Sequence, residues 1–194
     1  MIALANKNDA ADTARRQELE AKYQKEYDAY QAKKTAQDTE LSNKYFATFS
    51  QYKDKVSTFD TASVKELGKE DLVVGEGTEL TPDSSFTAYY LGWTPDGKIF
   101  DGSIDGEKLK APFSVAPGSV IKGWSEGVVG MKTGGVRLLT IPSDKAYGES
   151  GSGDSIPPNT PLRFVVMVIP TPEVIAEPSI PEELYRFYQN QGMM

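Results

Sequence analysis

The stretch "PFSVAPGSVIKGWSEGVVGMKTGG", residues 112–135, combines a short strand pattern with a short amphipathic helix. Trp124, Val128 and Met131 follow the i, i+4, i+7 spacing of one helix face. Trp124 is one of 2 tryptophans in the chain, and a glycine stands just before it and another three residues after it. The stretch therefore raises one question, which is whether this indole fills a core or forms the floor of a site.

Around this stretch, Gly and Pro are frequent and apolar residues come in short alternating runs, which is typical of strands joined by turns. The runs "DLVVGEG", "SFTAYYLGW", "VRLLTIP" and "LRFVVMVI" predict strands, and "PDGKIF" predicts a turn. In the second run, Phe86, Ala88 and Tyr90 fall on one face. We expect an α+β fold with a mostly antiparallel sheet and one helix packed across it.

Residues 9–60 contain neither Pro nor Gly and have the composition of a helix. They predict either one helix of about 50 residues, about 75 Å long, or two helices with a break near Asp38–Asn43. Two apolar stripes lie on one helix face, and a lone helix cannot bury them. The stripes are Leu19, Tyr23, Tyr27 and Tyr30, then Leu41, Tyr45, Phe49, Tyr52, Val56 and Phe59. This arm is either a solvated spacer with some self-packing or a dimerisation or docking helix.

The C-terminal segment "SIPEELYRFY" has a helix start, with Ser179 and Pro181 before two glutamates. Pro170, Pro172 and Pro178 predict a stiff, non-helical linker before it. The predicted organisation is an arm over 1–60, a domain over 61–170, and a linker with a helix over 171–194.

Composition excludes several classes of chemistry. The chain has 0 cysteine and 0 histidine, so disulfides, thiol nucleophiles, Ser-His-Asp triads and His-ligated metals are absent. The net charge of −7 makes the surface a poor match for nucleic acid. The sequence does not settle location: the chain is cytoplasmic, or extracytoplasmic if an N-terminal anchor or signal has been removed.

Two loops imitate ligand-binding motifs. "DGSIDGEKLKAP" resembles a calcium loop, but Pro112 stands where the bidentate glutamate is required. "GESGSGDS" is glycine-rich, but no Lys-Ser/Thr pair follows it. We therefore predict no metal site and read the second loop as a surface loop.

One larger constellation is drawn from several predicted strands, the short helix and the long loop. Its members are apolar or aromatic: Tyr90, Phe100, Phe113, Val120, Ile121, Trp124, Tyr147, Ile156 and Phe164. Spacing alone leaves two interpretations, an ordinary core or an apolar pocket open to solvent.

From about residue 62 to 170, the chain resembles an FKBP-type peptidyl-prolyl cis-trans isomerase domain. The resemblance is carried by "AYYLGWTPDGKIFDGS", the opening stretch, "LLTIPSDKAYG" and "SIPPNTPLRFVV", in the order and spacing of the family. It implies a curled antiparallel sheet wrapped on the short helix, with a pocket between them. The same residues would then serve as pocket wall and core.

The resemblance also implies a role for each residue of the constellation. Trp124 would form the floor under a bound proline ring, and Ile156 would close one side. The backbone N–H of Ile121 would donate to a substrate carbonyl, Tyr147 would offer its hydroxyl, and Asp101 would stand at the edge. The walls would be Tyr90, Phe100, Phe113, Val120, Ile121 and Phe164.

The chain departs from the family pattern in two places. Ser152 and Gly153 stand where the family often has a His-Pro pair, which puts substrate preference in doubt. In the last strand, Val165, Met167 and Ile169 should face the outer side of the sheet, with Leu138 beside them on a neighbouring strand. Contiguous apolar surface marks a contact. We expect the N-terminal helix, or the C-terminal helix with Leu184 and Phe187, to cover this patch.

The resemblance implies an enzyme that needs no cofactor, because isomerisation breaks no covalent bond. Its partners would be proline-containing polypeptides and macrolide ligands of the FKBP class. If the arm is a dimerisation helix, a second copy bound through the N-terminal helix is a further partner. The alternative is a non-catalytic proline-binding chaperone or scaffold with the helical arm as its interaction element.

Overall fold

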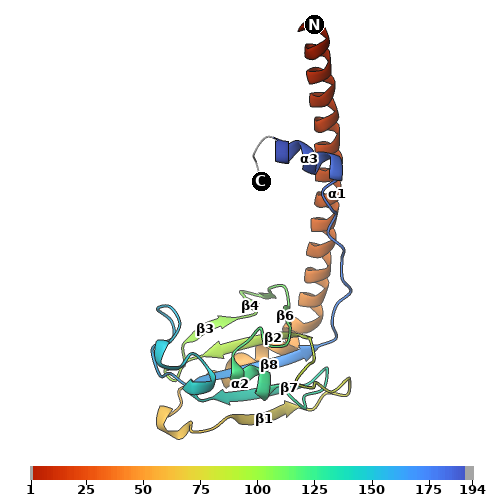
Figure 1. Cartoon of the computed structure of the whole chain (residues 1–194). Coiled ribbons are helices and arrows are strands. Elements are labelled where there is room, and N and C mark those ends of the chain that lie inside the picture. Colours follow the sequence, from red (N-terminus) through yellow and green to blue (C-terminus); the bar gives the residue numbers. More distant parts are fainter. Residues whose placement is uncertain (1, 191–194) are drawn as a thin grey trace. The chain divides into compact units, whose positions relative to one another are not determined.

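The computed structural model describes residues 2–190 and divides the chain into two compact units (Figure 1). The sheet unit is Asp38–Pro172, and the helical unit joins the residues up to Gln37 with those from Glu173 onward. Helix α1, Ile2–Ser50, contributes residues to both units. It is a single helix, so of the two predicted alternatives the one without a break holds.

Six strands form the main sheet, and all of their pairings are antiparallel. Their order is β1-β7-β8-β2-β3, with β6 also paired to β2. The strands are β1 (Gly68–Val73), β2 (Phe86–Trp93), β3 (Ile99–Gly102), β6 (Phe113–Val115), β7 (Val136–Ile141) and β8 (Leu162–Ile169). The central pair is β2 and β8, where Tyr90 lies opposite Val166. Because β3 and β6 pair with opposite ends of β2, they bring Phe100 and Phe113 to one edge of the sheet.

The remaining elements are short. A separate two-stranded hairpin joins β3 to β6, two 3-10 turns precede β1, and two more lie between β7 and β8. These elements are β4 (Ile104–Asp105), β5 (Lys108–Leu109), α2 (Lys122–Gly127), η1 (Gln51–Lys55), η2 (Thr61–Ser63), η3 (Ser143–Lys145) and η4 (Gly148–Ser150). The imitation calcium loop therefore folds as the β4–β5 hairpin.

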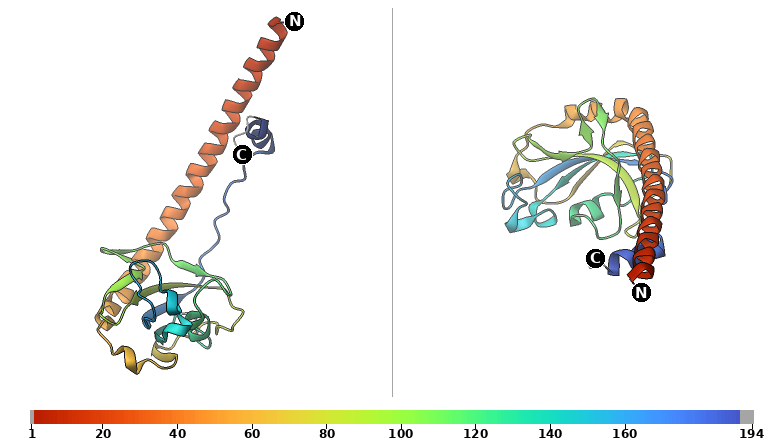
Figure 2. Two further views of the ribbon diagram at one scale, coloured as in Figure 1. Left: turned by 60° about the vertical axis from the view of Figure 1, so that its left-hand side comes forward. Right: turned by 90° about the horizontal axis from the view of Figure 1, so that it is seen from above.

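One face of the sheet packs on α2 and forms an inner cluster of buried side chains, which includes Phe86 and Ala88 of β2 and Trp124 of α2. Figure 2 shows α2 in the concave side of the curled sheet. Glycine allows this close approach: a Cβ at Gly123 would come within 2.2 Å of Cγ2 of Ile141 on β7. The predicted α+β fold, with a sheet curled on a short helix and a long helix before it, is confirmed.

The opposite face of the sheet forms an outer cluster, and the last part of α1 with the turn after it covers this face. Val165, Met167 and Ile169 are buried there, and Leu138 is partly buried against them. The covering side chains are Leu41, Tyr45, Phe46, Phe49, Tyr52, Val56 and Phe59. The prediction that the N-terminal helix covers this patch is confirmed.

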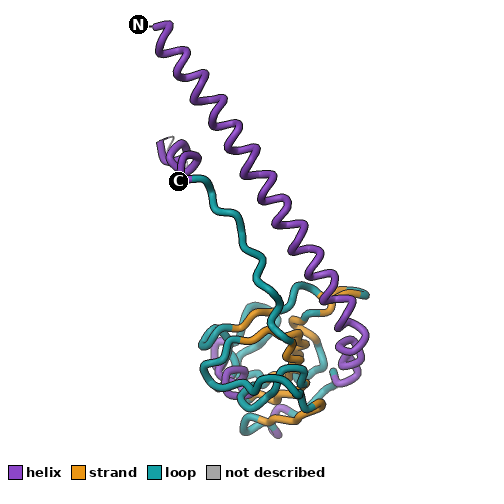
Figure 3. The backbone as a smooth tube through the Cα atoms, turned by 90° about the vertical axis from the view of Figure 1, so that its right-hand side faces the viewer, coloured by secondary structure: helices purple, strands orange, loops and turns teal. Residues whose placement is uncertain are grey.

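The helical unit pairs the first part of α1 with the C-terminal helix α3 (Glu182–Asn190), and Figure 3 shows the chain running back beside α1 to reach it. Arg15 donates to Glu183 with a closest N–O distance of 3.0 Å. Gln37 donates to the carbonyl of Glu173 at 2.8 Å. Leu184 is fully buried but belongs to neither cluster of the sheet. The described side chains that pack on the outer patch come from residues 41–59 and from the sheet domain itself.

Candidate active site

A pocket of about 310 Å³ opens between α2 and the concave side of the sheet. Nine of the ten predicted site residues line it, drawn from β2, β3, β6, β8, α2 and the loops beside them. The lining residues are Tyr90, Phe100, Asp101, Phe113, Ser119, Val120, Ile121, Trp124, Tyr147 and Phe164. Residues spread over 75 positions of sequence thus converge on one site.

Three aromatic rings contact the indole of Trp124 nearly at right angles, and a fourth ring contacts one of these three in the same way. The indole of Trp124 lies 5.4 Å from the ring of Tyr90, 5.5 Å from Phe164 and 6.2 Å from Phe113, measured between centroids. Phe100 meets Phe164 at 5.6 Å and 87°. Such edge-to-face contacts favour a fixed ring geometry. Trp124 is only 3% exposed, so its indole both packs in the core and lines the pocket.

The rim of the pocket is polar and more exposed. The hydroxyl of Tyr90 donates to Oδ2 of Asp101 at 2.5 Å, and the backbone N–H of Gly102 donates to Oδ1 of the same carboxylate at 2.8 Å. Burial, and then the hydrogen bond to Asp101, raises the pKa of Tyr90, so its hydroxyl stays protonated. Phe113 and Tyr147 are each 39% exposed, so an incoming chain can reach them.

Ile121 stands at the N-cap of α2, with extended backbone angles. Its carbonyl accepts the N–H groups of Trp124 and Ser125 at 2.9 and 3.1 Å. The carbonyl of Ile121 is thus used by the first turn of the helix.

Ile156 does not line the pocket. It is buried in the inner cluster, and its backbone pairs with Ser152 in an isolated bridge. Gly151 has a φ of 64°, and a Cβ there would lie 2.3 Å from the carbonyl of Ile156. This tight turn directs the chain so that Ile156 supports the loop from within the core.

Ser119 also lines the pocket, in addition to the predicted site residues. Its hydroxyl donates to the carbonyl of Ala116 at 2.8 Å and accepts the Ala116 N–H at 3.2 Å. The turn sequence "APGS" before the helix is the signal that could have found it.

Two charged contacts hold α2 beside the pocket. Lys145, on the turn that precedes Tyr147, donates to the carboxylate of Glu126. Arg137 is 6% exposed, donates through Nη1 to the carbonyls of Gly127 and Val129, and forms a two-pronged ion pair with Asp71 on β1. The burial of Arg137 is not visible in the sequence, because a charged residue in a strand normally faces solvent.

We expect Asp71→Asn to lower the free energy of unfolding by roughly 1 kcal/mol at pH 7, because the buried guanidinium of Arg137 loses its carboxylate partner. The loss is no larger because Asp71 itself is partly exposed. The hydrogen bond from Arg137 lowers the pKa of Asp71. A carboxyl with a lowered pKa stabilises the fold above its unfolded value, and this contribution is lost as pH falls. The difference between wild type and variant should therefore shrink below about pH 4 and vanish below the lowered pKa.

Urea unfolding between pH 2.5 and 7 measures this difference. Glu70→Gln is the matched control, because Glu70 is the exposed neighbour of Asp71 on the same strand. A constant difference between Asp71→Asn and wild type over the whole pH range would contradict the assignment.

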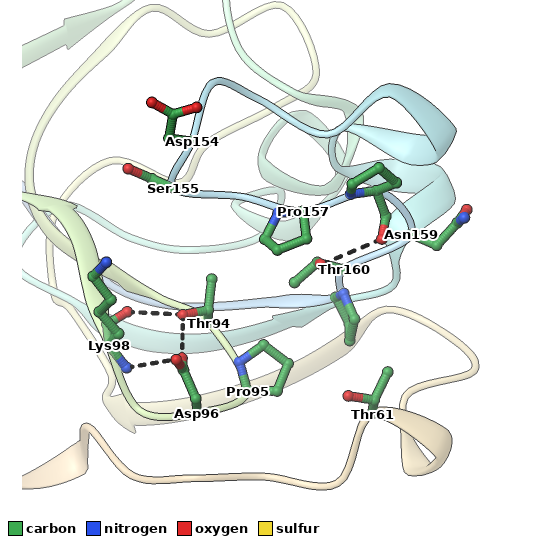
Figure 4. Close-up of a pocket in the computed structure, with 12 residues that line it drawn as sticks. Thr61, Thr94, Pro95, Asp96, Lys98, Asp154, Ser155, Pro157, Asn159 and Thr160 are labelled. Carbon is green, nitrogen blue, oxygen red and sulfur yellow. Dashed lines mark hydrogen bonds between the residues drawn. The ribbon is translucent and has the colours of Figure 1, made fainter.

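A second hollow, of about 450 Å³, lies between the β2–β3 turn and the loop before β8 (Figure 4). Within it, Thr94 donates to Asp96 at 2.6 Å and to the carbonyl of Lys98 at 3.1 Å. None of the predicted site residues lines this hollow. Its polar groups brace the turn rather than converge on a central point.

Among the described residues, no group of three or more acidic side chains is arranged to hold a metal ion. No helix within residues 2–190 has the length and apolar character needed to cross a membrane.

Comparisons with known proteins place the sheet domain in a family. A family model of the FKBP-type peptidyl-prolyl cis-trans isomerases matches residues 76–169. The FK506-binding protein of Neisseria meningitidis serogroup B is 44% identical over 100 residues, which are 52% of this chain and 91% of that protein. FK506-binding protein 4 of Dictyostelium discoideum is 46% identical over 102 residues, which are 52% of this chain and 27% of that protein.

Among solved structures, a peptidyl-prolyl cis-trans isomerase of Pseudomonas syringae is 33% identical to this chain, with a TM-score of 0.49. The matched region is 70% of this chain and 96% of the Pseudomonas chain. The family model carries the description of a peptidyl-prolyl isomerase, and the Neisseria relative, which this chain covers to 91%, is an FK506-binding protein. The chain belongs to the FKBP-type peptidyl-prolyl cis-trans isomerases. The resemblance seen in the sequence is confirmed.

Proposed function

We propose that this chain catalyses cis-trans isomerisation of X-Pro bonds in unfolded or partly folded polypeptides, and that the turnover takes place in the aromatic pocket. The observation that supports this most is the convergence of six aromatic side chains and the Tyr90–Asp101 pair on one cavity of about 310 Å³. The proposed occupant is a proline ring above Trp124.

The physics of the reaction fits such a pocket. Resonance gives the peptide C–N bond double-bond character and a rotation barrier of about 18–20 kcal/mol. The twisted amide at the top of the barrier has lost this resonance and is less polar than the planar amide. An apolar cavity therefore opposes the twisted form less than the planar form. No covalent bond breaks, so the reaction requires no nucleophile and no cofactor.

Each lining residue takes one part in this proposal. Trp124 supports the proline ring from below, and the N–H of Ile121 donates to a flanking carbonyl of the peptide. Tyr147 offers a second hydroxyl at the rim, and Asp101 stands beside the rotating bond. The remaining residues form the walls: Tyr90, Phe100, Phe113, Val120 and Phe164. Ile156 supports the loop on one side. Holding both flanks of the bond favours the twisted geometry.

The testing experiment is isomerisation of Leu-Pro and Phe-Pro tetrapeptides by wild type, Phe100→Ala and Asp101→Ala. We expect each variant to lose about tenfold or more in kcat/KM, since about 1.4 kcal/mol of transition-state stabilisation corresponds to tenfold. Ile99→Ala is the matched control, because Ile99 is the exposed neighbour of Phe100 on β3 and does not line the pocket. A folded wild type without activity would sink the enzyme proposal.

Macrolide ligands of the FKBP class would occupy the same cavity in this proposal, and would therefore compete with the tetrapeptide.

The second candidate is a non-catalytic proline-binding chaperone or scaffold that works through the helical unit as a docking or dimerisation element. The observation that favours it is that this unit is compact and separate from the sheet unit. On its α1 face, Tyr23, Tyr27 and Tyr30 form a ladder with ring centroids 6.1 and 5.9 Å apart. Turnover of the tetrapeptide separates the two candidates, because a binding module would hold the peptide without accelerating its isomerisation.

A further inference from the structure

The segment between β3 and β6, residues 103–112, has a special position, because both of its ends belong to the pocket. Asp101 and Phe113 line the cavity just before and just after it. The segment folds into the β4–β5 hairpin, whose two strands pair only with each other. The contacts that the segment makes with its surroundings therefore fix the hairpin and, with it, the two rim residues.

The end of α1 makes this attachment. The hydroxyl oxygen of Ser42 accepts the backbone N–H of Leu109 at 2.8 Å. Ser42 is 6% exposed and Leu109 is 4% exposed, so this hydrogen bond lies in a dry environment. Leu109 is part of the outer cluster and Ile104 packs against it, and α1 covers that same cluster.

A second set of hydrogen bonds joins the hairpin to the pocket wall. The N–H of Lys110 donates to the carbonyl of Ser103 at 2.8 Å. Ser103 is buried, donates its N–H to the carbonyl of Tyr90 at 2.8 Å, and accepts the N–H of Tyr90 on its hydroxyl at 2.9 Å. Tyr90 in turn holds Asp101. A continuous series of contacts thus runs from Ser42 through the hairpin to the Tyr90–Asp101 pair.

We propose that Ser42 of α1 is a specificity-determining positioning residue of the isomerase: it fixes the β4–β5 hairpin and thereby the rim residues Asp101 and Phe113 that meet the substrate residue preceding proline. This inference rests on the proposed function. Ser42 does not touch the pocket and acts only through the hairpin. The last turns of α1 therefore take part in substrate selection, although they lie on the other face of the sheet from the proline site.

The test measures kcat/KM of the full chain for a series of X-Pro tetrapeptides in which X is Ala, Leu, Phe or Glu. In Ser42→Ala the Leu109 N–H loses its acceptor. We expect the ratio of the Phe-Pro to the Ala-Pro value to change by about threefold or more, because a displaced rim alters transition-state binding of large side chains most. Ser42→Thr keeps the hydroxyl acceptor and should restore the wild-type ratio.

Ser50→Ala is the matched control, because it makes the same chemical change on the same helix and Ser50 forms no side-chain cap hydrogen bond. Ser42→Cys, which keeps the volume but offers a weak acceptor, supplies the answer if Ser42→Ala does not fold. A ratio within about twofold of wild type in the folded variants, or an equal loss for all four peptides, would overturn the proposal. A wild type that turns over none of the peptides would instead overturn the proposed function.

Discussion

The fragment 61–172, which lacks the arm, is expected not to fold cooperatively, whereas the fragment Asp38–Pro172 is expected to fold and to isomerise tetrapeptides at close to the wild-type rate. The reason is that the outer cluster draws its cover from residues 41–59. Phe49 is completely buried and Tyr52 nearly so. Each large apolar side chain that loses its burial costs roughly 1.5–3 kcal/mol, against a total stability of about 5–15 kcal/mol for a domain.

Circular dichroism and urea unfolding of the two fragments measure this difference. Fragment 38–172 retains both clusters of the sheet, and it omits the helical unit, which does not contribute to either of them. A cooperative transition for fragment 61–172 with a midpoint near that of fragment 38–172 would contradict the structural role of the last part of α1.

Met167→Asp is expected to lower the free energy of unfolding by about 3–5 kcal/mol at pH 7, since it places an unpaired carboxylate among apolar side chains. Met167 is 4% exposed and lies in the outer cluster, opposite Tyr89 and Val136 in the sheet register. Because α1 of the same chain covers this position, the effect should appear in stability.

Met167→Leu is the control, since it keeps the position apolar at similar volume and usually costs less than about 1.5 kcal/mol.

Burial should raise the pKa of the new carboxyl above its unfolded value. The ionisation penalty of such a group shrinks as pH falls through its raised folded-state pKa, so the loss for Met167→Asp should become smaller as pH is lowered from 7 and reach its minimum at about pH 4, the unfolded value. Unfolding followed by the fluorescence of the buried Trp93 and Trp124 measures both effects. A loss below about 1 kcal/mol at pH 7 would mean that the position is not enclosed.

The strands, the helices and most of the pocket could be predicted from the sequence because they follow from periodicity and from family spacing. The run "LRFVVMVI" has a single charged residue in eight, which indicates a strand buried on both faces, and β8 is buried on both. The two stripes of α1 have similar spacing, so periodicity could not tell which one covers β8. Only the second stands close in sequence to the first strand of the sheet, and it is this stripe that packs there.

Three side chains show where the sequence was insufficient. Arg137 can be buried because Asp71 and two backbone carbonyls accept its hydrogen bonds, and Asp71 lies 66 positions away in sequence. Ile156 points into the core because of a tight glycine turn. Ser42 is an ordinary helix residue until the hairpin is placed beside it. In each case the deciding partner is set by tertiary structure, which local propensity does not encode.

The burial of β2 and β8 on both faces also limits how this protein can change over evolution or be modified in the laboratory. An antiparallel strand usually offers every second position to solvent, but here seven of the eight residues of each strand are buried. Drift in these strands is confined to substitutions that conserve volume. Fluorophores, cross-linkers and affinity tags therefore belong outside β2 and β8, where they leave both clusters undisturbed.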